Sequence, residues 1–294
     1  MRRVLVVGDL VTDVIAAASG PVAEGTDTEA AISFRGGGSA ANTAAWLARL
    51  GVSVTLVAAV GQDAAGEERI AELRDAGVAC AAVRLPAPTG TVVVLATGAE
   101  RSMLCDRGAN ALLAPEHVDA ALHGAPDAAH LHLSGYPLFD ERSRPAGLRA
   151  LAAARSAGLS TSVDAASAGP LRRVGAAAFL HWVRDADLLF ANADEARVLV
   201  GDGPPRRLAE ALAGVAGAAI VKLGADGAVQ AGIGGFAQAP AAPADVTDVT
   251  GAGDAFAAGA LHAWLAGAAP EQVLAEGAGL AAEAISRPGA RPAR

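Results

Sequence analysis

The stretch SAANTAAWLARLGVSVTLVAAVG, residues 39–61, contains a helix followed directly by a strand, and this succession decides the fold. Its first part, residues 39–51, has the spacing of apolar residues found in helices. Ser39 is expected at the N-cap, and Gly51 just after the C-cap. Its second part, residues 52–61, is almost continuously apolar. Such a run is typical of a parallel strand that is buried on both faces.

The same succession repeats on either side of this stretch. Further strand-like apolar runs occupy residues 4–7, 127–135, 158–166, 185–192 and 218–224. Segments with helical spacing lie between them. In one of these, residues 65–77, Ile70 and Leu73 share one face and charged residues the other. Alternation over most of the chain predicts an α/β fold with a parallel sheet covered by helices on both faces.

Two segments, residues 14–37 and 88–108, break the alternation. The first alternates only weakly, and the second is rich in Val and Thr around a Gly-Ala-Glu-Arg turn. Both are predicted to form antiparallel hairpins, which could pair in space as a small sheet. A small β-element inserted in an α/β core commonly covers an active site. The alternative is an edge extension of the main sheet.

Composition excludes several classes of protein. Hydrophobic residues make up 52% of the 294 positions, which is enough for a sizeable core. The net charge of −8, without a Lys/Arg cluster, argues against nucleic acid or anionic membrane as the main partner. Cys80 and Cys105 lack the spacing of a zinc site or a disulfide framework. No run approaches the roughly 18 apolar residues of a membrane span, so a soluble, cytoplasmic protein is expected.

Residues 248–259, DVTGAGDAFAAG, place glycines ahead of a helix expected over 254–265. Successive N–H groups of residues 250–253, together with the positive end of the helix, can form an anion hole for a phosphoryl group. Asp254 in the first turn is either a cap that stabilises the helix dipole or a general base for a substrate hydroxyl. A Walker-type motif is absent, and the near match to a nucleophile elbow at Ser39 leaves a hydrolase as a weak alternative.

Five motifs occur in order along the chain: GGGSAANTAAWLARLG (36–51), NADE (192–195), VKLGADG (221–227), DVTGAGDAF (248–256) and AISRPGARP (284–292). Together they resemble the ribokinase family, the PfkB-type carbohydrate kinases. The resemblance implies one kinase domain over residues 1–294, with a three-layer α/β/α core and a mainly parallel central sheet. The two hairpins would form its β-sheet lid. It also implies ATP- and Mg²⁺-dependent phosphorylation of a hydroxymethyl group on a sugar or nucleoside. Many relatives pair their lids, so a homodimer is expected.

The resemblance also assigns roles to residues. Asp254 corresponds to the catalytic base, with an anion hole at Gly251, Ala252 and Gly253. Residues that correspond to the family's substrate contacts are Asp13, Gly38 and Asn42. The nucleotide-binding turn corresponds to Lys222, Gly224 and Gly227. Asn192 and Glu195 would organise Mg²⁺ and phosphate, largely through water.

Some of these residues also have plain structural interpretations. Without the resemblance, Asn192 and Glu195 would be a helix N-cap followed by a solvated acid. Lys222 would be a cation at the end of a strand. Asn42 would be an ordinary polar residue of an amphipathic helix.

The resemblance further implies a monovalent-cation site that would take K⁺. Asp248 and the Thr250 carbonyl would form one half of it. Backbone carbonyls would supply the other half, at Ala284, Arg287 and Gly289.

Departures from the family's pattern bear on the substrate. Val11 stands where ribokinases carry Asn, and Gly135 and Tyr136 where they carry a Glu. Both changes remove polar ligands for a small pentose, so ribose is not the first choice. Tyr136 is expected either to stack on a larger sugar or a nucleoside, or to pack in the core. A nucleoside kinase and a non-catalytic sugar or nucleotide sensor therefore remain alternatives to a sugar kinase.

Arg107 has two interpretations as well. Its guanidinium could bind a carboxylate or phosphate of the substrate. It could equally form a surface ion pair with Asp106 or Glu100.

Overall fold

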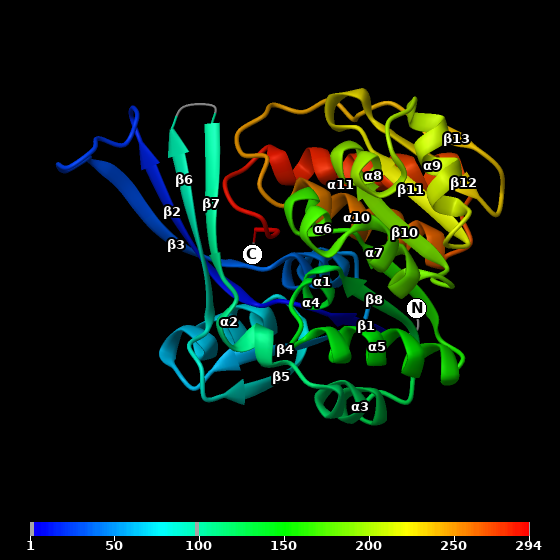
Figure 1. Cartoon of the computed structure of the whole chain (residues 1–294), viewed down its shortest axis with the longest axis horizontal. Coiled ribbons are helices and arrows are strands. Elements are labelled where there is room, and N and C mark those ends of the chain that lie inside the picture. Colours follow the sequence, from blue (N-terminus) through cyan, green and yellow to red (C-terminus); the bar gives the residue numbers. More distant parts are fainter. Residues whose placement is uncertain (1–2, 98–99, 294) are drawn as a thin grey trace.

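The structure is a computed structural model that describes residues 3–97 and 100–293. Figure 1 shows a large sheet with helices on both faces and a smaller sheet standing beside this core. Over the described residues, the large sheet has nine strands in the order β13-β12-β11-β10-β9-β8-β1-β4-β5. A second sheet within the same ranges has four strands in the order β3-β2-β6-β7.

The large sheet is parallel from β5 to β11, and its last two strands pair antiparallel at one edge. This confirms the mainly parallel sheet that the sequence predicts. Its strands are β1 (Arg3–Val7), β4 (Val54–Gly61), β5 (Ala79–Leu85), β8 (Ala128–Ser134), β9 (Ser160–Asp164), β10 (Leu188–Asn192), β11 (Ala218–Lys222), β12 (Ala228–Gly232) and β13 (Ala237–Ala239).

Two hydrophobic cores lie on opposite faces of this sheet. In β1, Val4 and Val6 point into one core, and Leu5 and Val7 into the other. The first core is covered by α1 (Ser39–Arg49), α2 (Ala64–Asp75), α10 (Ala252–Leu265) and α11 (Pro270–Ile285). The second is covered by α3 (Pro115–His123), α5 (Arg144–Ser156), α6 (Ala168–Val174), α7 (Ala176–Val183), α8 (Ala193–Val200) and α9 (Pro205–Ala213). The predicted three-layer arrangement is confirmed. The short helices are α4 (Tyr136–Phe139), η1 (Gly108–Leu112) and η2 (Gly224–Asp226).

The helix predicted over residues 39–51 is α1, but the prediction of its N-cap was wrong. Gly38 caps the helix with a φ of 97°, a value that favours glycine. Ser39 is the first helical residue, and its hydroxyl points to another part of the chain, as described below. At the other end Gly51 has a φ of 78°, as expected for a glycine that ends a helix.

Helices α10 and α11 pack with their backbones very close together. A Cβ added at Gly259 of α10 would lie 2.6 Å from the Glu276 carbonyl oxygen of α11. A Cβ added at Gly277 of α11 would lie 2.9 Å from the ring of Phe256. The two glycines therefore allow a contact that a larger side chain would push apart. This matters because α10 carries Asp254 in its first turn.

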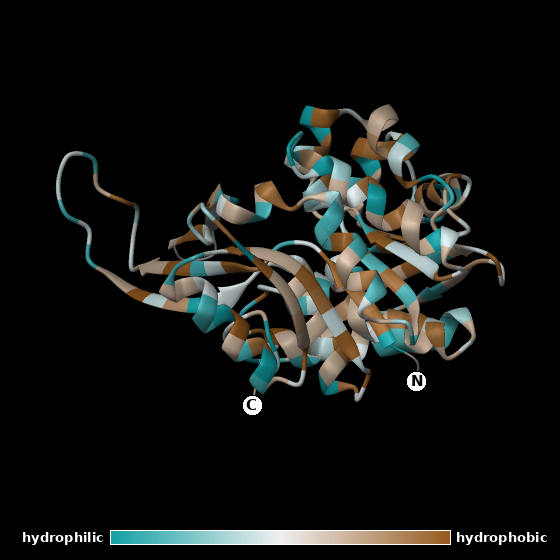
Figure 2. Cartoon of the chain, turned by 90° about the horizontal axis from the view of Figure 1, so that it is seen from below, coloured by the Kyte–Doolittle hydropathy of each residue, from teal (hydrophilic) through white to brown (hydrophobic). Residues whose placement is uncertain are grey.

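The small sheet consists of two hairpins. Strands β2 (Val11–Ala18) and β3 (Ala30–Gly37) pair antiparallel, as do β6 (Gly90–Thr97) and β7 (Glu100–Asp106). Parallel pairing of β2 with β6 joins them into a sheet separate from the large one. The edge-extension alternative is therefore wrong, and the small separate sheet is confirmed. Figure 2 shows the connection between β2 and β3 extending far from the core.

The two faces of the small sheet differ in chemistry. A row of directly opposite residues crosses all four strands on one face: Phe34, Val14, Val93 and Leu104. The neighbouring row projects from the opposite face and comprises Arg35, Asp13, Val92 and Cys105. Burial raises the pKa of the Cys105 thiol, and the carboxylates of Asp13 and Asp9 raise it further. Because Asp9 belongs to the core, the face with Asp13 is turned toward the core, and the apolar row points away from it.

The helices and the two cysteines bear on two expectations from composition. None of the helices in the described ranges has both the length and the hydropathy needed to cross a bilayer. Cys80 on β5 and Cys105 on β7 are free thiols.

Candidate active site

Polar side chains gather where the parallel strands of the large sheet end. Asp164 is the last residue of β9, and Asn192 and Lys222 end β10 and β11. The last two stand directly opposite each other in the sheet. The carboxyl edge of a parallel sheet is where α/β proteins commonly bind ligands. The N-terminus of α10 meets this edge, because a Cβ added at Gly253 would lie 3.4 Å from Lys222 Nζ.

Asp254 is held by two side chains of α1. Ser39 Oγ donates to Asp254 Oδ1 at 2.8 Å, and Asn42 Nδ2 donates to Asp254 Oδ2 at 2.9 Å. Burial raises the pKa of Asp254 to about 6, against the lowering effect of these two hydrogen bonds. Its carboxylate is therefore oriented by neighbours and easier to protonate than an exposed one. Both properties suit a general base working near neutral pH.

The pH dependence of catalysis should report this carboxylate. Since Asp254 must be ionised to accept a proton, kcat/KM is expected to fall as the pH drops through about 6. Burial also raises the pKa of Asp13 to about 6, so the acid limb should be steeper than one ionisation gives. Initial rates at saturating ATP and Mg²⁺ across the pH range test this. In Asp13→Asn the limb should become less steep by one ionisation, leaving those of Asp254 and Glu195. A flat profile from about pH 5 to about pH 8 would contradict the assignment.

The turn before α10 contains a left-handed glycine, and one of its amides is already hydrogen-bonded within the turn. Gly251 is the N-cap residue, with a left-handed φ of 77°. A Cβ there would lie 2.6 Å from the Cα of Ala290, so both the backbone and the space require glycine. The amide of Ala252 is already in contact with the Val249 carbonyl at 3.3 Å, and Gly253 follows it in the first helical turn. The role of Gly251, Ala252 and Gly253 as an anion hole stays a prediction.

Lys222 does not stand alone at its strand end. Its Nζ donates to Asp164 Oδ2 at 2.7 Å, and both side chains are mostly buried. Burial lowers the pKa of Lys222, but the carboxylates of Asp164 and Glu195 outweigh it and raise the pKa above its usual value. The ammonium group therefore stays charged beside the turn at Gly253. This position suits contact with a phosphate, although Asp164 offsets part of its charge.

Asn192 and Glu195 form a capping box at the start of α8. Asn192 Oδ1 accepts from the Glu195 amide at 2.9 Å, and Glu195 Oε2 accepts from the Asn192 amide at 2.8 Å. The N-cap interpretation of Asn192 is thus correct. Its other half, a solvated Glu195, is wrong because that residue is 3% exposed. Burial and then Asp164 raise the pKa of Glu195 to about 7.

Gly224 and Gly227 bracket a tight turn after β11. Their φ values are 63° and 88°, and the Leu223 amide donates to the Gly227 carbonyl at 2.8 Å. A Cβ at Gly227 would collide with the backbone carbonyl of Ala239 on β13. The turn directly follows Lys222, so it borders the same edge of the sheet. Binding of a nucleotide by this turn stays a prediction.

The residues predicted to bind the substrate gather at the N-terminal end of α1, where Asn42 contacts Asp254. Asn42, 5% exposed, bonds to it directly. Gly38 caps the same helix, and a Cβ there would collide with the Asp9 carbonyl. Asp13 lies on the small sheet beside Gly37, where any side chain would collide with the Asp13 carboxylate. The structure thus brings Asp13, Gly38 and Asn42 to the same end of α1.

The predicted cation site is assembled only in part. Asp248 accepts from the amides of Thr250 at 2.9 Å and Gly289 at 3.0 Å, while its own amide donates to the Ile285 carbonyl at 3.1 Å. Ala284 is buried within α11. The Arg287 side chain pairs with a glutamate of the same helix. The loop before α10 therefore meets the end of α11 and the tail at Asp248, and K⁺ binding stays a prediction.

Arg107 pairs with Asp9 rather than with Asp106. Its guanidinium binds the Asp9 carboxylate through Nε at 3.0 Å and Nη2 at 2.6 Å, and Nη1 donates to Ser143 Oγ at 3.0 Å. The pair is mostly buried, so the surface ion pair was wrong for Asp106. The side chain of Glu100 lies outside the described residues. A buried bidentate pair is neutral overall. Its two hydrogen bonds hold the Asp9 carboxylate in place just after the carboxyl end of β1.

Tyr136 follows β8 and is half-buried. Its ring makes an edge contact with Phe139 at a centroid distance of 5.9 Å. Burial raises the pKa of its hydroxyl, and the carboxylates of Asp254 and Asp9 raise it further. The Tyr136 ring thus packs against Phe139, and its hydroxyl is near enough to the candidate site for Asp254 and Asp9 to affect its pKa.

Three residues of the candidate site were not predicted from the sequence: Asp164, Asp9 and Arg291. Asp164 could have been found, because it ends a strand at the same edge as Lys222. Asp9 could have been suspected from its place after the first strand. Arg291 lies in an irregular tail and has no periodic signal. Its side chain nevertheless donates to Asn42 Oδ1 at 3.2 Å.

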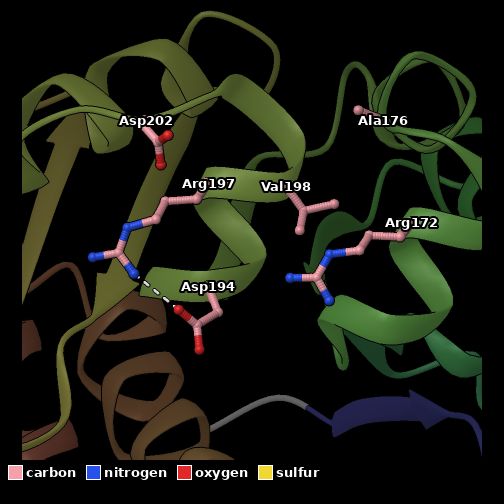
Figure 3. Close-up of a pocket in the computed structure, with 6 residues that line it drawn as sticks. All are labelled: Arg172, Ala176, Asp194, Arg197, Val198 and Asp202. Atoms are coloured by element: carbon pink, nitrogen blue, oxygen red, sulfur yellow. Dashed lines mark hydrogen bonds and ion pairs between the residues drawn. The ribbon is translucent and has the colours of Figure 1, made fainter.

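Figure 3 shows a separate hollow of about 490 Å³ on the outside of α8. It is lined by Arg172, Ala176, Asp194, Arg197, Val198 and Asp202. Arg197 pairs with Asp194 at 2.8 Å, and the lining holds two acids for its two arginines. Since its charges are balanced and Asp254 is not among its residues, this hollow is not the candidate active site.

Comparison with known proteins identifies the class of this fold and site. The whole chain, residues 1–294, matches the pfkB family of carbohydrate kinases. The chain belongs to that family, as the five motifs suggested. A relative from Halopiger xanaduensis, named an ATP-dependent ribose-1-phosphate kinase, is 34% identical over 270 residues, which are 88% of this chain and 83% of the relative.

Solved structures agree in fold. An adenosine kinase from Sinorhizobium meliloti superposes with a TM-score of 0.88 at 27% identity, covering 99% of this chain and 96% of that one. A putative ribokinase II from E. coli, solved in complex with ATP and Mg²⁺, gives a TM-score of 0.86 at 23% identity over 99% and 94% of the two chains. The second likeness is one of fold alone. This chain is therefore a kinase-family protein with the ribokinase-like fold.

Proposed function

We propose that this protein is an ATP-dependent carbohydrate kinase that transfers the γ-phosphoryl group of ATP to a hydroxymethyl group of a sugar. One observation carries the proposal. Asp254, with a pKa of about 6, is held by Ser39 and Asn42 in the first turn of a helix whose start adjoins the Lys222 ammonium. A base and a cationic phosphate site thus lie side by side.

In the proposed reaction, Asp254 accepts the proton of the substrate hydroxyl as its oxygen attacks the γ-phosphorus. A new P–O bond forms to the sugar, the bond to the bridging oxygen of ATP breaks, and ADP leaves with that electron pair. The amides of residues 251–253 and the start of α10 would stabilise the charge on the transferring group. The carboxylate of Asp13 would accept hydrogen bonds from neighbouring hydroxyls and so orient the acceptor.

The residues present fit a magnesium ion that is held mainly by phosphates and water. Among the residues that the structure describes, no three His, Cys, Asp or Glu side chains are grouped as a protein-only metal site. Asn192 and Glu195, next to Asp164 and Lys222, would hold the ion's water ligands. Mg²⁺ would neutralise charge on the ATP phosphates. K⁺ at Asp248, Thr250 and the carbonyls of residues 284, 287 and 289 remains part of the proposal.

The acceptor is proposed to be a sugar or sugar derivative larger than a free pentose. Val11, Gly135 and Tyr136 supply no carboxylate or amide for small-sugar hydroxyls, and Tyr136 presents a ring near Asp254 and Asp9. Support for a nucleoside acceptor comes from the structural likeness to an adenosine kinase. The relative named a ribose-1-phosphate kinase supports a phosphorylated sugar.

A substrate panel tests the proposal. The purified protein is given ATP, Mg²⁺ and in turn pentoses, hexoses, sugar acids, sugar phosphates and nucleosides, and ADP release is measured. Release with a carbohydrate alone supports the carbohydrate kinase, and release with nucleosides alone supports the nucleoside kinase. Measurable ATP binding without ADP release for any acceptor would favour a non-catalytic sensor. A cytoplasmic location, where ATP is plentiful, belongs to the same proposal.

A homodimer is proposed through the apolar face of the small sheet. Phe34 and Leu104, 69% and 62% exposed, end a four-residue apolar row that a second copy would cover. The double substitution Phe34→Glu, Leu104→Glu should therefore shift the protein from dimer to monomer in size-exclusion chromatography with light scattering. Ile233→Glu is the control, since Ile233 is 84% exposed outside the small sheet. A wild-type monomer at micromolar concentration would contradict the proposal.

A further inference from the structure

The C-terminal tail, residues 286–293, connects three parts of the molecule. Arg35 of β3 donates to the Pro288 carbonyl at 3.1 Å, and Trp46 Nε1 of α1 donates to the Ala290 carbonyl at 2.9 Å. The Gly289 amide donates to Asp248 just before the turn at Gly251. In Figure 1 the tail leaves α11 and ends between the core and the small sheet. Its course brings Arg291 to the N-terminal end of α1, beside Asn42.

Arg291 makes a separate contact with each of its three nitrogen atoms. Nε donates to Asn42 Oδ1 at 3.2 Å, Nη2 donates to the Gly37 carbonyl at 2.8 Å, and Nη1 lies 3.4 Å from Glu72 Oε2. The side chain is 14% exposed. A Cβ at Gly36 would collide with Nη1, so the glycine leaves the space that the guanidinium fills. The guanidinium is thus fixed in place by α1, α2 and β3.

The contact with Asn42 determines how that amide can be oriented. A side-chain amide has an acceptor end and a donor end. The acceptor end of Asn42 faces Arg291, and the donor end faces Asp254 Oδ2. If the amide turned over, its NH₂ group would face the guanidinium and its oxygen would face the carboxylate. Both new contacts would be repulsive, so Arg291 favours the orientation in which Asn42 donates to Asp254.

We propose that Arg291 is a positioning residue for phosphoryl transfer: its guanidinium fixes the Asn42 amide, and through it the Asp254 carboxylate. Ser39 holds the second carboxylate oxygen, so Asp254 keeps one restraint without Arg291. The inference rests on the proposed function. It extends that function to the tail, which reaches the base from a position 37 residues beyond Asp254 in the sequence.

Arg291, Asn42 and Asp254 form a chain of contacts, and the charged groups around Arg291 and Asp254 determine how the loss of Arg291 would change the pH dependence of kcat. Arg291 is surrounded by Glu72 and Arg69 of α2, Asp13 of β2 and Cys80 of β5. Asp254 faces Asn42 and Ser39 of α1, Asp164 of β9, Lys222 of β11 and Tyr136. Loss of Arg291 weakens the Asn42 bond to Asp254 and removes a cation near Asp13. Both changes make the two carboxylates easier to protonate.

Kinetics of Arg291→Ala test the proposal. We expect kcat to fall by about 10-fold with a smaller change in the KM for ATP, and the acid limb of kcat to move to higher pH. Arg291→Lys keeps the charge without the planar fork and should restore only part of kcat. Arg35→Ala is the matched control, because it removes a contact between the tail and β3 but not the one with Asn42. It should leave kcat and the pH profile close to those of the wild type.

A double-mutant cycle with Asn42→Ala isolates the contact. If Arg291 acts through Asn42, Arg291→Ala should lower kcat less than about 2-fold once Asn42 is gone. Equal effects in the two backgrounds would overturn the proposal, as would an unchanged acid limb. If Arg291→Ala fails to fold, Arg291→Gln gives the same cycle. ATP binding by each variant is measured separately, so failure of this inference can be told from failure of the kinase assignment, which would abolish turnover in the wild type.

Discussion

Replacing Asp254 with Asn is expected to lower kcat by at least about 10²-fold while ATP binding is retained. The amide has nearly the same shape: its oxygen can accept from Asn42 and its NH₂ group can donate to Ser39 Oγ, yet it cannot take the proton of the acceptor hydroxyl. ADP release under saturating substrates measures kcat, and calorimetric titration with ATP and Mg²⁺ measures binding. Under the proposed function the loss belongs to the chemical step, because the substitution leaves Lys222 and residues 251–253, the proposed phosphate contacts, in place.

Ser39→Ala serves as the control for this experiment. It removes one of the two hydrogen bonds to the carboxylate but leaves the base itself, so the fall in kcat should be much smaller, of about 10-fold or less. Near-normal turnover in Asp254→Asn would remove the base assignment. If Ser39→Ala were inactive at the same time, a serine nucleophile would have to be reconsidered.

Gly251→Ala is expected to reduce both stability and turnover. The residue has a left-handed φ of 77°, and a Cβ would lie 2.6 Å from the Cα of Ala290 in the tail. Backbone strain and overpacking together should lower the free energy of unfolding by about 2–4 kcal/mol. The turn that is proposed to bind the phosphate would shift as well. Denaturant unfolding measures the first effect, and kcat measures the second.

Gly253→Ala is the matched substitution two residues away. The nearest atom to its Cβ would be Lys222 Nζ at 3.4 Å, the end of a side chain that can move. Its φ is not left-handed, and alanine favours a helix, so stability should change by no more than about 1 kcal/mol. Equal destabilisation by the two substitutions would mean that neither the φ of Gly251 nor its contact with the tail is important.

The fold could be predicted largely from local patterns. The pattern of residues 39–61 predicts a helix followed by a buried strand. Repetition of that unit leaves few arrangements other than a parallel sheet with helices on both faces. The second sheet followed from the Val- and Thr-rich segment at 88–108. Ser39 was assigned to the wrong role because a serine before an apolar run usually caps a helix. Here Gly38 takes the cap, and Ser39 is free to bond to Asp254, a partner 215 residues away.

Residues of the candidate site could be predicted only where they belong to one of the family's sequence motifs. Asp254 and Asn42 were implied by the family resemblance, and the structure brings them together, although their roles stay predictions. The partner of Arg107 could not be predicted, because Asp9 lies 98 residues away in the sequence and the adjacent Asp106 offered a nearer carboxylate for an ion pair. Arg291 belongs to no periodic element. Contacts of this kind depend on tertiary packing, which sequence spacing does not encode.

The glycine contacts between α10 and α11 have a consequence for how such a protein can move during a catalytic cycle. With Gly259 against the Glu276 carbonyl and Gly277 against the Phe256 ring, no free space is left at this crossing for one helix to slide past the other. Helix α10 therefore holds Asp254 in a fixed position relative to α11. Any movement that brings the acceptor and Asp254 together would therefore have to come from elements other than α10. The acceptor would be carried to a stationary base.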